Sequence, residues 1–181
     1  MRFALGAVAI IICLLSIAVS LVAIGSGLGI LALPFEMFRL REEIPLIFSA
    51  HMLSSAVALL LTPLVIVLRG RPQMHRMLGR VVGAFVVAGG LTAFPVAIFS
   101  HSPGLARAGF FVQGVVWLGL LLAGLSAIRR GDVSGHARAM LAMAAVATGA
   151  VWFRLLTGMA ILFEAPFVPV YSVAAWLAWM V

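Results

Sequence analysis

Histidine is the residue type in this sequence best suited to cofactor chemistry. The four histidines are His51, His75, His101 and His136. His75 and His136 each follow an arginine-rich loop, at the start of a predicted membrane helix. Two neutral imidazoles from facing helices are the usual axial ligands of a b-type haem, and helix-bundle cores are where such sites are built. The pair predicts a haem b site, and the alternative is two amphipathic residues at the membrane interface.

Three arginines lie close to this pair in the sequence: Arg76, Arg80 and Arg138. Guanidinium groups bind carboxylates strongly, so these side chains are predicted to hold the haem propionates. A zinc site needs three or four protein ligands, and two histidines at each membrane face supply too few. We therefore predict no metal other than haem iron, and no other cofactor.

Arg154 is the second candidate for chemistry, because it interrupts the apolar stretch V-W-F-R-L-L. A charge inside a membrane helix costs at least ~2.5 kcal/mol, so it should find a partner. His51 is predicted at a similar depth, and the two residues are expected to share a ligand pocket for an anion. The alternative is an Arg154 side chain that snorkels outward to the membrane surface.

The composition excludes a soluble globular protein. Of 181 residues, 65% are hydrophobic and 9% are charged, whereas a soluble domain is about a quarter charged. Mean hydropathy is +1.25. The chain has one cysteine, Cys13, so an intramolecular disulfide is impossible.

Nucleotide-binding loops and the G-x-S-x-G and H-E-x-x-H motifs are also missing, so the sequence gives no positive indication of an enzyme.

Apolar stretches predict an all-α, polytopic transmembrane helix bundle of about six spans. A spanning helix needs about 20 mostly apolar residues. Segment 34–43 is expected to be either a short interfacial helix or a polar loop. The first span is expected to be an uncleaved helix and not a signal peptide. The predicted spans cover 4–33, 44–68, 79–100, 108–128, 139–163 and the short segment 168–181.

The arginines predict how the chain is oriented. Eight of the twelve basic residues fall on one predicted side, and Arg39, Arg41 and Arg107 fall on the other. Cytoplasmic loops of membrane proteins are enriched in arginine, so the N-terminus and the two arginine-rich loops are predicted to be cytoplasmic. The net charge of +7 is then explained by topology. We predict a multi-pass protein of the cell (inner) membrane with no nucleic-acid partner.

A short internal repeat relates the two arginine-rich loops. Residues 69–75 and 130–136 both read R-G-x-x-x-x-H. If it is real, the second and third spans repeat as the fourth and fifth, and His75 is equivalent to His136. Adding the sequence distance between the two repeats to the position of His51 gives Val112, which is beside Gln113. Gln is not a standard haem ligand. A second haem at the outer end is therefore not predicted.

The segments 51–63, 74–81, 129–140 and 151–155 resemble the bacterial membrane proteins grouped as domain of unknown function 2306. The likeness extends over roughly 45–181, and H-R-x-L-G-R and G-D-x-x-x-H are its most specific parts. This sequence departs from the family pattern at Ala139 and Ala142, where the family usually has a Trp and an Arg. The resemblance implies no activity, but it carries over nine motif positions: His51, His75, Arg76, Gly79, Arg80, Asp132, His136, Met140 and Arg154.

Together these features predict a first helix and outer loop over 1–43 and a five-span bundle over 44–181. The leading hypothesis is electron transfer through a haem held by His75 and His136. One alternative is a cofactor-free small-molecule or lipid-binding or transport protein that uses His51 and Arg154. The other is an accessory subunit of a membrane complex. The lipid bilayer is the expected partner, with a second membrane protein or a second copy of the chain as open alternatives.

Overall fold

Helices form all of the regular secondary structure of the described residues. The computed structural model describes the backbone of residues 2–180 and the side chains of residues 6, 7 and 10–180. Within that range there is no strand, which confirms the all-α prediction. The elements are α1 (Arg2–Gly27), α2 (Phe35–Glu43), α3 (Pro45–Val67), the 3-10 turn η1 (Leu68–Gly70), α4 (Pro72–Phe99), α5 (Gly104–Arg129), α6 (Val133–Ala147), α7 (Gly149–Leu162) and α8 (Phe167–Met180).

Five stretches of helix are long and apolar enough to cross a membrane, which confirms a polytopic bundle. The α6 and α7 helices together make one such stretch, Val133–Leu162. The sixth predicted span corresponds to α8, which has 14 residues. At 1.5 Å per residue it is about 21 Å long, less than the roughly 30 Å hydrocarbon thickness. The described part of α8 is therefore too short to cross alone.

Two helices begin earlier than their apolar stretches predict. The α4 helix starts at Pro72 rather than near 79, and α6 starts at Val133 rather than near 139. Hydropathy marks only the lipid-facing part of a helix, whereas these helices start inside the arginine-rich loops. Proline suits the first helical position, where its missing N–H is not needed, and Asp132 caps the other start. Both early starts place a histidine in the first helical turns.

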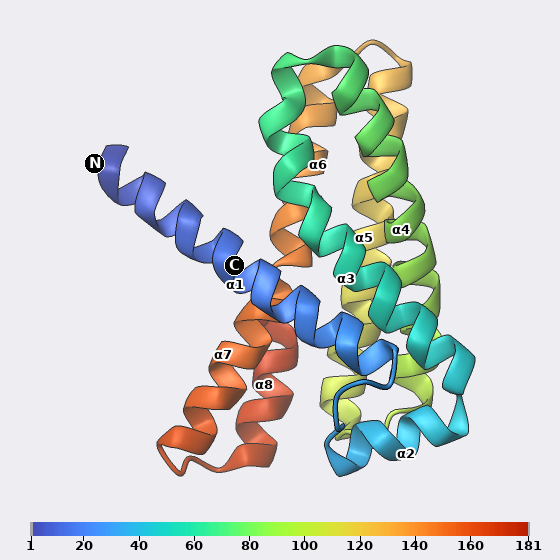
Figure 1. Ribbon diagram of the computed structural model, residues 1–181, viewed down its shortest axis with the longest axis vertical. Helices are drawn as coiled ribbons and strands as arrows, with labels where there is room; N and C mark the ends of the chain where they lie inside the picture. The colour runs from blue at the N-terminus through green and yellow to red at the C-terminus, as the bar shows by residue number, and fades with distance from the viewer. Residues whose placement is uncertain (1, 181) are drawn as a thin grey trace.

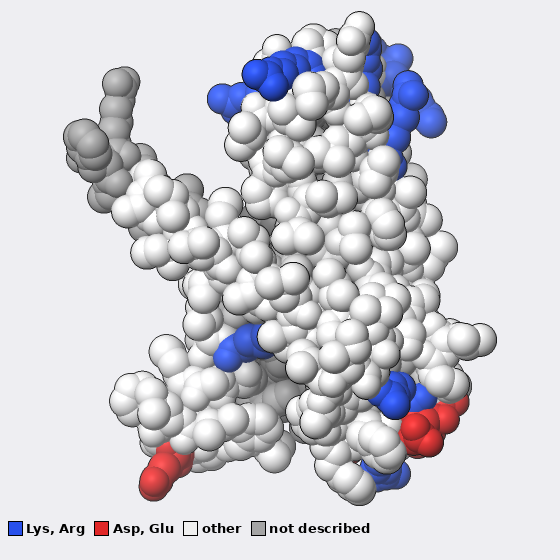
Figure 2. Space-filling model, viewed as in Figure 1, with Lys and Arg blue, Asp and Glu red and all other residues white. Residues whose placement is uncertain are grey.

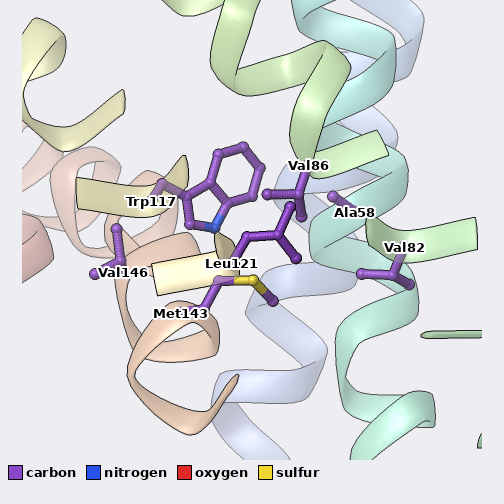
Figure 3. Close-up of a cluster of buried hydrophobic side chains, with 7 residues drawn as sticks. All are labelled: Ala58, Val82, Val86, Trp117, Leu121, Met143 and Val146. Atoms are coloured by element: carbon purple, nitrogen blue, oxygen red, sulfur yellow. The ribbon is translucent and has the colours of Figure 1, made fainter. Parts of the chain in front are cut away.

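Two antiparallel hairpins, α3–α4 and α5–α6, form the centre of the molecule (Figure 1). Their shared core is built from side chains of all four helices, and Trp117 is its largest member (Figure 3). Small and β-branched residues opposite the indole let the helices approach closely. The buried members of this core are Ala58, Val82, Val86, Trp117, Leu121, Met143 and Val146.

The α1 helix crosses the bundle obliquely and packs mainly on α3 (Figure 1). Residues 35–43 form the helix α2, so the helical alternative for this segment is right. Its Leu40 is buried with Phe48 and Met52 of α3, while its charged residues are solvent-facing or partly so. The α2 helix therefore covers one end of the bundle.

A kink at Thr148 divides the predicted fifth span into α6 and α7. Thr148 Oγ1 donates to the carbonyl of Ala145, 2.7 Å away, and such back-bonding bends helices. The side-chain amide of Gln113 donates to the nearby carbonyl of Val146 at 3.2 Å. Beyond the kink, α7 and α8 lean away from α3 and α4 as a separate hairpin (Figure 1).

Charge is divided between the two ends of the molecule. On the face that Figure 2 shows, the charged side chains of the upper end are basic, and the lower end carries both signs. The upper end also holds one acid, Asp132, in the α5–α6 turn. The upper end holds η1 and the α5–α6 turn, and the lower end holds α2. This agrees with the charge separation expected from the sequence, except that the side chain of Arg2 lies outside the described residues.

Candidate functional site

His75 and His136 occupy equivalent positions and lie close together. Each is the fourth residue of its helix, α4 or α6. Their ring centroids are 6.5 Å apart and the ring planes are nearly perpendicular, at 88°. The structure therefore brings together the two imidazoles that the sequence predicts as a pair.

Both rings are oriented by a carbonyl of the preceding helix. His75 Nδ1 lies 3.0 Å from the carbonyl oxygen of Val65, and His136 Nδ1 lies 2.9 Å from that of Gly124. A carbonyl can only accept, so each Nδ1 must carry the proton and donate. In a neutral imidazole this leaves Nε2 with a free lone pair, as in metal-ligating histidines. Among the described residues, neither Nε2 has a hydrogen-bond partner.

Different local features bring the two helices to these starting points. Asp132 caps α6, accepting from the backbone N–H of Gly135 at 2.8 Å and from the Ser134 hydroxyl at 2.9 Å. These hydrogen bonds lower the pKa of the Asp132 carboxyl. Gly131 reverses the chain with a φ of 79°, a conformation that favours glycine. Its repeat partner Gly70 ends η1 instead, so the two loops match in the placement of histidine but not in turn geometry.

The three predicted propionate-binding arginines lie at the same end as the histidine pair. Arg76 follows His75 directly, Arg80 is one turn further along α4, and Arg138 is two residues after His136. All three side chains are exposed. In the described part of the chain none of them forms an ion pair, so their charge is available to an anionic group.

Small residues line the face of α4 below His75. A Cβ added at Gly79, one turn deeper, would come no nearer than 4.0 Å to the Val65 side chain. A Cβ at Gly83 would come within 3.9 Å of Leu121. Two turns before Gly124 on α5, the buried indole N–H of Trp117 has no partner among the described residues. An added methyl group at either glycine would thus meet its neighbour at ordinary contact distance, and the core contains an unused donor.

The second hairpin repeats the first at the outer half of the bundle. His51 of α3 donates from Nδ1 to the carbonyl of Gly89 on α4, at 3.0 Å. Gln113 of α5 makes the corresponding bond to α6 through the carbonyl of Val146. Each side chain therefore cross-links its own hairpin, although Gln113 lies one residue beyond the repeat position of His51.

His51 and Arg154 do not share a pocket, contrary to the expectation from the sequence. His51 turns toward α4, whereas Arg154 belongs to α7, which is not a neighbour of α3. The kink at Thr148 carries α7 away, and a residue's depth along a helix does not reveal this. A further contact that the sequence does not reveal is the hydrogen bond between His101 Nε2 and Glu43 Oε1, at 2.8 Å.

Some features of the site give no signal in the sequence. The acceptors Val65 and Gly124 act through backbone carbonyls, which every residue carries. The unpaired N–H of Trp117 follows from how four helices pack around it. Only Gly79 and Gly83, four residues apart near His75, form a pattern that could have indicated the small-residue face of α4.

A family model described as predicted membrane protein (DUF2306) matches residues 48–181. That match includes the four helices of the centre. The chain belongs to the DUF2306 family. The DUF2306 match contains His51, both members of the histidine pair and Arg154, and it leaves out α1 and α2. The curated proteins contain no match to the chain, and neither do the solved structures.

Proposed function

We propose that this DUF2306 protein binds one b-type haem through His75 and His136 and transfers electrons in the membrane. The observation that carries the proposal is the pair of imidazoles 6.5 Å apart, each with Nδ1 engaged by a backbone carbonyl. This arrangement fixes the tautomer that a metal ligand needs.

The spacing of the pair suits two ligands of one metal ion. Metal–imidazole bonds are about 2 Å long, so imidazoles on opposite sides of one ion have centroids roughly 6 Å apart. Rotation about a metal–nitrogen bond leaves that spacing unchanged, and the observed 88° between the planes is compatible with it. Both side chains start from rigid first turns of helices, which limits the movement needed.

The number of ligands favours haem over a bare metal ion. In the described residues no group of three or more histidine, cysteine or acidic side chains could hold a metal. A bare zinc ion needs at least three protein ligands. Haem brings its own four nitrogens and needs only the two axial ligands that His75 and His136 offer.

The surroundings of the pair also suit this cofactor. The exposed guanidinium groups of Arg76, Arg80 and Arg138 would meet the propionates, and the glycines Gly79 and Gly83 keep side-chain bulk off the adjoining face of α4. Held by His75 and His136, haem would supply one-electron transfer. We propose the cell membrane as its location, with this end in the cytoplasm.

An absorption spectrum tests the proposal directly. Protein purified from haem-replete cells should be coloured, and its visible bands should sharpen and shift on chemical reduction. His75→Ala and His136→Ala should each lose at least nine-tenths of the haem per protein. His101→Ala is the matched control and should keep it, because His101 pairs with Glu43 at the opposite end.

The same preparations can overturn the proposal. Wild-type protein that is folded by circular dichroism, comes from haem-replete cells and shows no haem absorption would exclude it. So would haem binding that survives in the double variant of His75 and His136.

A further inference from the structure

Arg154 carries a positive charge in the interior of a membrane-spanning stretch. It lies within Val133–Leu162, eight residues before the outer end of α7, or about 12 Å. Every acidic residue of the chain lies outside the long helices. Those acids are Glu36, Glu42, Glu43, Asp132 and Glu164. The sequence therefore offers no acidic neighbour at this depth, and membrane arginines without one mark functional sites.

The side chain of Arg154 does not snorkel toward the outer surface. Its Nη1 donates to the carbonyl of Ala150, one turn back on the same helix, at 2.9 Å. That bond directs the guanidinium toward the kink at Thr148 and away from the α7–α8 turn. Among the described residues this is the only hydrogen bond of the Arg154 side chain. Because a guanidinium has five N–H donors, the remaining donors are available to a ligand.

The molecule is hollowed in front of Arg154. Residues three apart on a helix lie on the same side. Val151 and Thr157, three residues before and after Arg154, are buried, at only 1% and 9% exposed. Arg154 between them is exposed. Figure 2 shows a hollow beneath α1, between α7 and the end that carries α2, with basic atoms at its edge. Arg154 is the only basic residue of α7.

The charge and the size of the hollow limit its occupant. A second copy of this chain cannot neutralise Arg154, because its long helices contain no acid. A spanning helix from another protein needs about 30 Å of free length. Here α1 crosses above the hollow (Figure 2), and α7 continues for only about 12 Å beyond Arg154. A short anionic group fits these limits.

We propose that Arg154 binds an oxyanion, a phosphate or carboxylate group, that enters this hollow from the outer half of the membrane. Guanidinium groups bind both anions bidentately. The group belongs either to the head of an anionic lipid or to a free small anion, and the chemistry at Arg154 is the same. This site lies on α7, apart from the histidine pair, so it does not depend on the haem proposal.

Thermal unfolding in two lipid settings tests the proposal and separates the two sources. The protein is placed in phosphatidylcholine nanodiscs with added inorganic phosphate or succinate, and in nanodiscs that contain phosphatidylglycerol without added anion. At an anion or lipid concentration well above Kd, Tm should rise by roughly 5 °C in at least one setting. The shift should vanish in Arg154→Leu and persist in the control Arg39→Ala, an exposed arginine of α2.

A conservative variant covers the case in which Arg154→Leu fails to fold. Arg154→Lys keeps the charge but cannot form a bidentate pair, and its apparent affinity should fall about tenfold. The proposal is overturned if wild type gains no stability in either setting, or if Arg154→Lys responds as wild type does. A co-purifying acidic membrane protein that depends on Arg154, with no shift in either setting, also overturns it.

Discussion

Single residues set the histidine pair in place through contacts with the backbone. Val65 and Gly124 hold the two rings through their carbonyls, while Asp132 fixes where α6 begins. A helix start that moved by one residue would rotate His136 by about 100°. The position of the candidate ligand therefore depends on a cap four residues earlier in the chain.

At this scale we predict that Asp132→Ala lowers Tm and that Asp132→Asn lowers it less, since asparagine keeps the cap but not the charge. Hydrogen bonds from Gly135 and Ser134 lower the pKa of Asp132. Its stabilising effect is therefore fully present above the ordinary pKa of about 3.9 and is lost as pH falls through the lowered value. Thermal melts in detergent at neutral pH and near pH 3 measure this.

The difference between wild type and Asp132→Ala should shrink at the acid end of that series. A difference that stays constant across the range would contradict a role for the carboxylate charge.

At the scale of helices, close packing depends on where glycine is placed. On α5, Gly109 faces α8 so closely that an added Cβ would lie 2.8 Å from the carbonyl oxygen of Ala175. Gly119 on the same helix faces open space. The short helix α8 is thus held to the bundle partly through backbone contact at a glycine, as is common between membrane helices.

These two glycines give a matched pair of substitutions. Gly109→Ala should lower stability by about 1–2 kcal/mol, because the overpacking cost exceeds the gain in helix propensity. Gly119→Ala should be neutral or stabilise by up to about 1 kcal/mol. Denaturant or thermal unfolding of the purified variants measures both effects. Equal effects from the two substitutions would contradict the packing of α5 on α8.

The whole molecule has one basic end and one end of mixed charge (Figure 2). The basic end contains the turns before α4 and α6, and therefore also the histidine pair. Positive loops remain in the cytoplasm, so electrons would enter the proposed haem from that side.

Cysteine labelling tests this orientation. In a Cys13→Ser background, Gly70→Cys and Gly104→Cys place single thiols at opposite ends, at glycines that face open space. A membrane-impermeant maleimide should label the Gly70→Cys variant only in inside-out vesicles. It should label the Gly104→Cys variant only in right-side-out vesicles. The reverse pattern would invert the topology.

The sequence by itself determined the helical class, the membrane setting and the charged end. Hydropathy and arginine placement depend only on residues close together in the sequence, so both can be evaluated without knowing the fold. The histidine repeat also identified His75 and His136 as equivalent positions, which the structure confirms.

Only the tertiary structure decided which side chains meet. The 6.5 Å approach of the rings and their carbonyl acceptors depend on how four helices cross. The separation of Arg154 from His51 depends on the bend at Thr148, where one threonine back-bond and the Gln113 amide redirect a whole helix. Contacts between residues distant in the chain are set by such bends and crossings, and local composition does not encode them.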